Sequence, residues 1–292
     1  MRIGIFPNLM KESSISLVQN IVSLCKENGC EYYVLYYEEE SDHAVYTGIE
    51  KEHLLSGEKI YDRIELAFVL GGDGTILKSA RHFASRGIPV CGINLGSLGF
   101  LYEVEAADLS ARFADILAGR YFKEERIMLA GELEYADGMI QRLPDALNDV
   151  VIGHGNVGKL VRVDMSINGY FVQQYPGDGI VVSTPTGSTG YTFSAGGPIV
   201  PPHVKGMMVT PICPHLLLKI PLVLSDDDRL SFSVRDSRNV VRISVDGMTD
   251  YEFACNMILH IRKSTAHLDF IRFDGGYFYA NLFKKMRDRK SV

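Results

Sequence analysis

Apolar residues alternate between short continuous runs and helically spaced positions through the first third of the chain. Continuous runs at 2–6, 32–37, 66–70 and 88–94 predict strands, and the apolar positions at 15–25 and 75–85 predict helices. Strands that alternate with helices in this way are typical of βαβ units around a parallel sheet. The polar stretch at 38–59, which includes an acidic run at 38–42, is expected to be a mobile connection rather than a packed element.

The pattern changes at residue 127, where helical spacing disappears. Strand-length apolar segments follow at 129–135, 161–167, 179–183, 230–234, 241–245 and 257–261, separated by turn dipeptides such as Asn168-Gly169 and Asp246-Gly247. A helical pattern returns at 277–289, and its apolar side consists of Phe278, Leu282, Phe283 and Met286.

These patterns predict an α/β N-terminal domain with a parallel sheet followed by a β-rich, sandwich-like C-terminal domain. The expected boundaries are 1–125 for the α/β domain, 126–273 for the β-rich domain, and 274–292 for a C-terminal segment. We expect the helix of that segment to dock back on the N-terminal domain.

Composition and charge narrow the classes of function. The chain has 292 residues, 46% of them apolar and 23% charged, which is typical of a globular protein. Its net charge of −6 provides no global positive field for nucleic acid or an anionic membrane, so any phosphate ligand must be bound by local groups. Five cysteines without a C-x-x-C pair, and no apolar leader or spanning segment, favour a cytoplasmic protein.

A glycine-rich turn follows the strand at 66–70 and opens a helix. Its residues are Gly71, Gly72, Asp73, Gly74 and Thr75. Backbone N–H groups and the helix dipole form an anion site at such a position, and glycines let a phosphate approach closely. A carboxylate here repels phosphate unless it accepts a proton or binds a metal, although Asp73 could instead cap the helix. The turn is neither a Walker A loop nor a Rossmann fingerprint.

Two further segments carry candidate chemistry. The segment 94–101 follows the next strand at the same edge of the sheet, and its Phe100 could stack on a base or serve as a core aromatic. Asn148-Asp149 precedes an apolar run, and a paired amide and carboxylate can read an adenine edge and bind a ribose diol, although the pair is also a common turn sequence.

The densest segment is 177–191, continuing to Pro198, where glycines, serines and threonines surround the apolar run 180–182. So many small residues cannot build a core, but they can let a planar or phosphorylated ligand approach backbone donors and hydroxyls.

Taken together, these segments resemble the NAD kinase family over essentially the whole chain. The 71–75 motif alone is shared with diacylglycerol and sphingosine kinases, whereas the 184–191 motif with 194–198 is far more specific. The resemblance implies phosphoryl transfer from ATP, or from inorganic polyphosphate, to the 2′-hydroxyl of the adenosine ribose of NAD, giving NADP. It also implies a homodimer or homotetramer.

The resemblance also implies a set of site residues. Asp73 looks like the catalytic acidic residue and general base, with Gly71, Gly72, Gly74 and Thr75 as the ATP phosphate loop. The positions that match contacts to NAD are Asp73, Gly74, Phe100, Asn148, Asp149, Asp178, Thr189, Gly190, Tyr191 and Ser194.

Three residues depart from the family pattern. Asp149 stands where Glu is usual, Gly190 replaces a usual Ala, and Pro176 precedes Gly-Asp-Gly where Arg is common. None of these changes removes a group that the chemistry needs. Each could shift affinity or the preference between NAD and NADH.

The metal is expected to arrive with ATP, as Mg²⁺ or another divalent cation, because the sequence has no His/Cys cluster and no carboxylates at metal-ligand spacing. Two alternatives remain open. One is a lipid kinase of the diacylglycerol type, and the other is a non-catalytic sensor that binds NAD(P).

Overall fold

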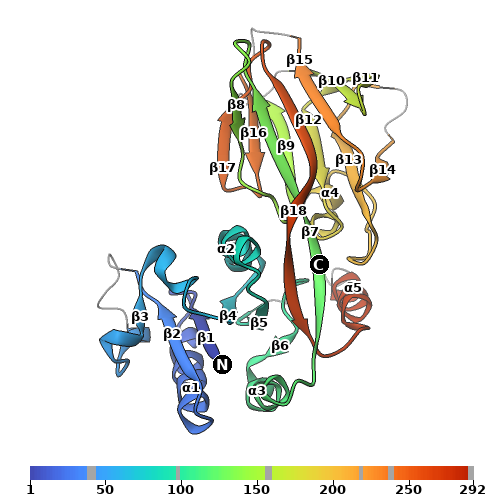
Figure 1. Cartoon of the computed structure of the whole chain (residues 1–292). Helices are drawn as coiled ribbons and strands as arrows, with labels where there is room; N and C mark the ends of the chain where they lie inside the picture. Colours follow the sequence, from blue (N-terminus) through green and yellow to red (C-terminus); the bar gives the residue numbers. More distant parts are fainter. Residues whose placement is uncertain (38–43, 97–98, 155–159, 217–219, 236–239, 289–292) are drawn as a thin grey trace. The chain divides into compact units, whose positions relative to one another are not determined.

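The computed structural model describes residues 1–37, 44–96, 99–154, 160–216, 220–235 and 240–288 (Figure 1). Two compact units divide the chain, one formed by Met1–Glu125 with Leu268–Val292 and the other by Arg126–His267. The domain boundaries expected at residues 125 and 273 stay a prediction. Parts of two predicted segments lie outside the described residues. They are residues 97–98 of the segment 94–101 and the acidic run 38–42.

The first unit contains a parallel sheet in the order β5-β4-β1-β2-β3, with β18 (Ile258–Arg272) joining β5 through Phe270. Its strands are β1 (Arg2–Phe6), β2 (Glu31–Leu35), β3 (Leu54–Leu55), β4 (Leu66–Gly71) and β5 (Val90–Asn94), and the short β6 (Val104–Glu105) pairs with β5. The parallel sheet predicted from the alternating pattern is confirmed.

Helices pack on both faces of this sheet because side chains alternate along each strand. Apolar residues of α1 (Ser13–Glu27) and α3 (Leu109–Leu117) share one core with Ile3 and Ile5. On the other face, Phe83 of α2 (Asp73–Arg86) contacts Phe6, with ring centroids 4.8 Å apart. The helix α3 was not predicted from the sequence.

The prediction of a mobile connection over 38–59 is wrong for its described part. Short 3₁₀ turns cover Ala44–Tyr46, Lys51–His53 and Gly57–Ile60. The side chains of Val45, Tyr46 and Ile49 are buried in the core beside α1. Their burial holds in place a segment whose many polar residues had indicated a mobile connection.

The second unit contains two antiparallel sheets. One runs β11-β10-β15-β18, with β7 and β8 beyond β18, and the other runs β14-β13-β12-β9-β16-β17. The strands are β7 (Phe122–Glu134), β8 (Ile140–Arg142), β9 (Asp149–His154), β10 (Val161–Ile167), β11 (Tyr170–Gly177), β12 (Gly179–Ser183), β13 (Gly206–Ile212), β14 (Leu222–Ser225), β15 (Leu230–Val234), β16 (Val241–Val245) and β17 (Thr249–Glu252).

Inward side chains of both sheets form a single apolar core, which includes Leu129, Val163 and Phe232 from one sheet and Ile152 and Ile180 from the other. The predicted β-rich character is therefore confirmed, and the strands over 161–167, 179–183, 230–234 and 241–245 have their predicted bounds.

The last helix, α5 (Tyr277–Asp288), belongs to the first unit, as predicted. Phe278 lies 6.0 Å from Phe100 between ring centroids, and Asn281 is buried. The sequence pattern also placed Met286 on the apolar side of this helix, but its side chain is not among those that the structure describes. Phe283 is 61% exposed, so it does not take part in the docking that the sequence pattern assigned to it.

Candidate functional site

The glycine turn lies where β4 ends and α2 begins. Gly71 has φ of +155°, and a Cβ atom there would lie 2.4 Å from Thr75 Oγ1, so only glycine fits. Added Cβ atoms at Gly72 and Gly74 would meet nothing within 4 Å, so the backbone of the turn faces open space. The N-terminal end of a long helix with exposed glycine backbone can attract an anion.

Asn8, which follows the end of the neighbouring strand β1, contacts this turn, since its Nδ2 donates to Thr75 Oγ1 at 3.3 Å. The strand order makes this junction a switch point, because the chain leaves β1 toward β2 and leaves β4 toward β5 on the opposite side. Ligands of open α/β sheets bind at the carboxyl ends of strands at such a point. Sequence reasoning missed Asn8, which its position just after a predicted strand could have flagged.

Asp73 does not cap the helix. The N-cap residue is Gly72, and Asp73 is the first residue of α2. Its carboxylate instead accepts two backbone hydrogen bonds, from Phe100 N–H at 3.1 Å and from Leu101 N–H at 3.2 Å. A Cβ atom at Gly99 would lie 2.1 Å from Asp73 Oδ1, so this close approach requires glycine. The predicted loop 71–75 and residues 99–101 of the predicted segment 94–101 therefore meet at Asp73.

Phe100 is half-buried beside α5 rather than deep in a core. Besides the contact with Phe278, the Lys285 Nζ lies 4.1 Å from the centroid of the Phe100 ring, within range of a cation–π interaction. The ring thus has an aromatic and a cationic neighbour, both supplied by the C-terminal helix.

In the second unit, Asn148 and Asp149 lie at the start of β9, held by Asp246. The Asp246 carboxylate accepts three backbone hydrogen bonds, from Leu147 at 2.9 Å, Asn148 at 2.8 Å and Asp149 at 3.0 Å. Asp246 sits at the turn between β16 and β17 with φ of +51°. Sequence reasoning saw only a turn there, because the three bonds join residues 97 to 99 positions apart.

The segment 184–190 packs against the same corner. Thr184 Oγ1 donates to the Leu147 carbonyl oxygen at 2.6 Å, and a Cβ atom at Gly187 would lie 2.1 Å from the Asn148 carbonyl oxygen. Arg126, a buried residue that sequence reasoning also missed, donates to Thr186 Oγ1 at 3.1 Å. The small residues therefore let two backbone segments pack in direct contact.

Asp149 is a buried carboxyl group, 6% exposed, close to a second one. Burial, and then the charge of Asp246, raise the pKa of Asp149 to about 7. Burial also raises the pKa of Asp246, while its three backbone donors act in the opposite direction. Burial, with the nearby Asp246 charge, therefore disfavours the ionised form of Asp149.

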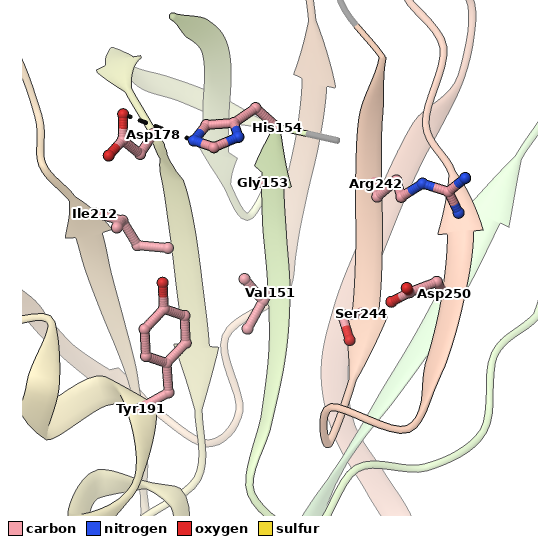
Figure 2. Close-up of a pocket in the computed structure, with 9 residues that line it drawn as sticks. All are labelled: Val151, Gly153, His154, Asp178, Tyr191, Ile212, Arg242, Ser244 and Asp250. Atoms are coloured by element: carbon pink, nitrogen blue, oxygen red, sulfur yellow. Dashed lines mark ion pairs between the residues drawn. The ribbon is translucent and has the colours of Figure 1, made fainter. Parts of the chain in front are cut away.

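Two adjoining pockets lie along β9. One, of about 400 Å³, is lined by Asn148, Asp149, Val151, Tyr191, Ser244, Asp246 and Gly247. The other, of about 460 Å³, shares Val151, Tyr191 and Ser244 and continues to His154, Asp178 and Arg242. Figure 2 shows the Tyr191 hydroxyl directed between Ile212 and Val151, and the His154 ring facing Asp178, with Nε2 3.9 Å from Oδ1.

The predicted residues are thus brought together within each unit. In the first unit Gly71, Gly72, Asp73, Gly74, Thr75 and Phe100 form one cluster. In the second unit Asn148, Asp149, Asp178 and Tyr191 line the pockets. Thr189, Gly190 and Ser194 belong to the adjacent turn and helix α4 (Tyr191–Ser194), but do not line either pocket among the described residues.

Two of the three residues that differ from the family pattern, Gly190 and Pro176, make no unusual contacts among the described residues. A Cβ atom at Gly190 would lie 3.3 Å from the Gly187 carbonyl oxygen and 3.8 Å from Asn148 Nδ2, which is close but not prohibitive. Pro176 lies in β11, and its carbonyl oxygen accepts the His215 N–H at 2.8 Å.

No set of three or more His, Cys, Asp or Glu side chains that could hold a metal ion occurs in the described residues. None of the helices in the described part of the chain has the length and apolarity needed to cross a membrane.

Two solved structures match the fold of the chain. Yeast NADH kinase complexed with NADH matches with a TM-score of 0.87 and 24% identity, over 100% of this chain and 89% of that one. An NAD kinase from Archaeoglobus fulgidus in complex with ATP matches with a TM-score of 0.75 and 23% identity, over 98% and 99%. The chain therefore has the same fold as these two kinases.

Comparisons of the sequence identify the family. The ATP-NAD kinase N-terminal domain matches residues 3–121 and the C-terminal domain matches residues 147–273. The NAD kinase of Natranaerobius thermophilus is 34% identical over 99% of both chains, and that of Heliobacterium modesticaldum is 42% identical over 77% of this chain and 79% of its own. The chain belongs to the NAD kinase family and is an enzyme of that kind. Neither the lipid kinase nor the sensor alternative is favoured.

Proposed function

We propose that the chain transfers the γ-phosphate of ATP to the 2′-hydroxyl of the adenosine ribose of NAD, giving NADP, with Asp73 as general base. The observation that carries this proposal is a carboxylate fixed by two backbone N–H groups at the head of a helix whose glycine turn faces open space. A ribose hydroxyl is a poor nucleophile near pH 7, and a positioned base contributes about 10² to 10⁴ in rate.

The ATP phosphates would bind at the turn Gly71–Thr75. Supporting this, the turn offers exposed backbone at the positive end of α2 and lies at the switch point of a parallel sheet. Backbone donors of this kind stabilise the charge that develops on a transferring phosphoryl group. Inorganic polyphosphate is an alternative donor with the same chemistry at its reacting end.

The dinucleotide would bind along β9. The Asn148 amide can read the adenine edge, and the Asp149 carboxylate can accept hydrogen bonds from a ribose diol. Asp178 and Tyr191 line the adjoining space, which suits the remainder of the dinucleotide. Gly74, Phe100, Thr189, Gly190 and Ser194 complete the proposed contacts. The side chain of Asp149 is one methylene shorter than that of Glu, so the ribose must lie closer to β9.

A divalent cation would arrive as part of the ATP substrate, and Mg²⁺ is the ion we propose. It would neutralise phosphate charge during transfer. We also propose a homodimer or homotetramer, in line with the family resemblance, and a cytoplasmic location, in line with five cysteines that form no disulfide in the described structure.

The test is Asp73→Asn, compared with Asp108→Asn, which makes the same charge change at an exposed position of the same unit. NADP formation from NAD, Mg²⁺ and ATP is measured with an NADP-specific reporter reaction, and NAD binding by calorimetry. We expect Asp73→Asn to lower kcat by about 10² to 10⁴ while NAD still binds. Turnover at the level of Asp108→Asn would contradict the assignment of the base.

A further inference from the structure

The residues Gly99–Leu101, here called the 99–101 loop, are held on two sides. Asp73 accepts the N–H groups of Phe100 and Leu101. The carbonyl groups at the two ends of the loop are bound by residues from the end of the chain, since Asn281 Nδ2 donates to the Gly99 oxygen at 3.3 Å and Arg272 Nη1 donates to the Leu101 oxygen at 3.2 Å. Both of these partners are buried.

Arg272 is fixed in its own right. Its side chain is 1% exposed, with Nε 3.1 Å from Glu124 Oε2 and Nη1 3.8 Å from Glu103 Oε2. The guanidinium also lies 4.9 Å from the centroid of the Phe270 ring and 5.4 Å from that of Tyr277. The ion pair with Glu124 and the two rings restrain the buried guanidinium, so it can serve as an anchor for Leu101.

Asn281 anchors the other end of the loop from helix α5. Phe278 and Lys285 of the same helix contact the ring of Phe100, so α5 touches the loop at both Gly99 and Phe100. These contacts join residues up to 182 positions apart, and together they leave the loop little freedom to shift relative to Asp73.

We infer that Arg272 and Asn281 are positioning residues for phosphoryl transfer, which act by holding the 99–101 loop so that its two N–H groups fix the orientation of the Asp73 carboxylate. This inference rests on the proposed role of Asp73 as general base. Neither residue is needed to touch substrate. Their effect is on the direction in which the carboxylate presents its free lone pairs.

The position of a base matters far more to the reaction step than to substrate binding. A shift of about 1 Å in a reacting group can lower the rate about 10²-fold. Releasing one anchor of the loop should therefore lower kcat and leave the KM for NAD and for ATP nearly unchanged. General weakening of the fold would instead lower the amount of active enzyme and the thermal midpoint together.

The test is Asn281→Ala in the full chain, with Phe283→Ala as the matched control on the exposed side of the same helix. We expect Asn281→Ala to lower kcat by about 10- to 100-fold, with both KM values within about threefold of the wild type, and Phe283→Ala to leave kcat unchanged. Arg272→Lys, which keeps the charge but loses the planar fork, is expected to lower kcat in the same way.

The decisive measurement places Asn281→Ala in the Asp73→Asn background. If α5 acts through Asp73, the second substitution changes the residual kcat by less than about threefold. An equal loss of kcat in both backgrounds would overturn the inference, because the helix would then act independently of the carboxylate. Wild-type kcat in Asn281→Ala, beside an inactive Asp73→Asn, would overturn the positioning role and leave the proposed function intact. Full turnover by Asp73→Asn alone would overturn both.

Discussion

Replacing Asp149 by Asn should make the protein more stable at neutral and alkaline pH. Asp149 is buried near Asp246, and its pKa is raised from 3.8 to about 7. Between these two values the carboxyl group is protonated in the folded chain and ionised in the unfolded chain. The folded state therefore binds more protons, and stability falls as pH rises through this window.

The size of the effect follows from the pKa shift. A shift of about three pKa units corresponds to about 4 kcal/mol of lost stability once the pH exceeds the folded pKa, at about 1.4 kcal/mol per unit. Asn is neutral at every pH and carries no such penalty. The stability advantage of Asp149→Asn should grow by about 3 kcal/mol between pH 5 and pH 8, and nearly all of that growth should occur below pH 7.

The measurement is urea unfolding of the wild type and the variant at pH 5, 6, 7 and 8, compared in the same buffers so that other titrating groups cancel. Asp227→Asn, at an exposed position of the same unit, is the control for the loss of one carboxyl group. An Asp149→Asn advantage that stays flat from pH 5 to pH 8, or a variant less stable than the wild type at pH 8, would refute the reasoning.

The same substitution should weaken NAD binding. A carboxylate that is unfavourable in the empty site becomes useful when two ribose hydroxyls donate to it, because the ligand then supplies the donors that burial has removed. Asp149 would thus lower the stability of the fold and increase the affinity for NAD, as residues at ligand sites commonly do. Calorimetric titration with NAD at pH 8 measures this second effect.

Two further outcomes are expected. Gly187→Ala should destabilise the protein by about 2 kcal/mol or more and raise the KM for NAD, because its Cβ would lie 2.1 Å from the Asn148 carbonyl oxygen, whereas Gly190→Ala should remain within about 1 kcal/mol of the wild type. Thermal unfolding and NAD kinetics of the pair decide this, and equal stability of the two variants would contradict it. Removing divalent cations with a chelator should abolish NADP formation and restore it on addition of Mg²⁺, without loss of NAD binding; turnover in excess chelator would contradict a metal–ATP substrate.

Local patterns were sufficient for elements whose structure depends on their own side chains. The buried runs of β1, β4 and β5 and the alternating runs of β10, β15 and β16 were predicted because apolar spacing records burial directly. Strands β11 and β13 were missed. The first begins with exposed residues and ends in Pro-Gly, and the second contains Pro211, so neither sequence resembles a typical strand.

The same distinction between local and long-range interactions applies to the residues of the candidate site. Asp73 and Asn148-Asp149 could be singled out because glycines or an adjacent apolar run mark them locally. The groups that fix them could not, because Asp246, Arg272 and Asn281 act on backbone atoms 97 to 182 positions away. A single sequence gives no sign of which carboxylate in a turn will meet three N–H groups. The described part of the stretch 38–59 was misjudged for a related reason, since three of its apolar residues are buried against a helix from elsewhere in the chain.

The return of residues 268–288 to the first unit has a consequence for the order in which the protein is made. Domains generally fold as units during synthesis, with the N-terminal domain first. Here Met1–Glu125 lacks a strand, a buried arginine and a helix until residues 268–288 have been synthesised, whereas Arg126–His267 is complete before then. We expect the second unit to fold first on the ribosome, so that the carboxylate proposed to activate NAD is fixed only after residues 268–288 have been synthesised.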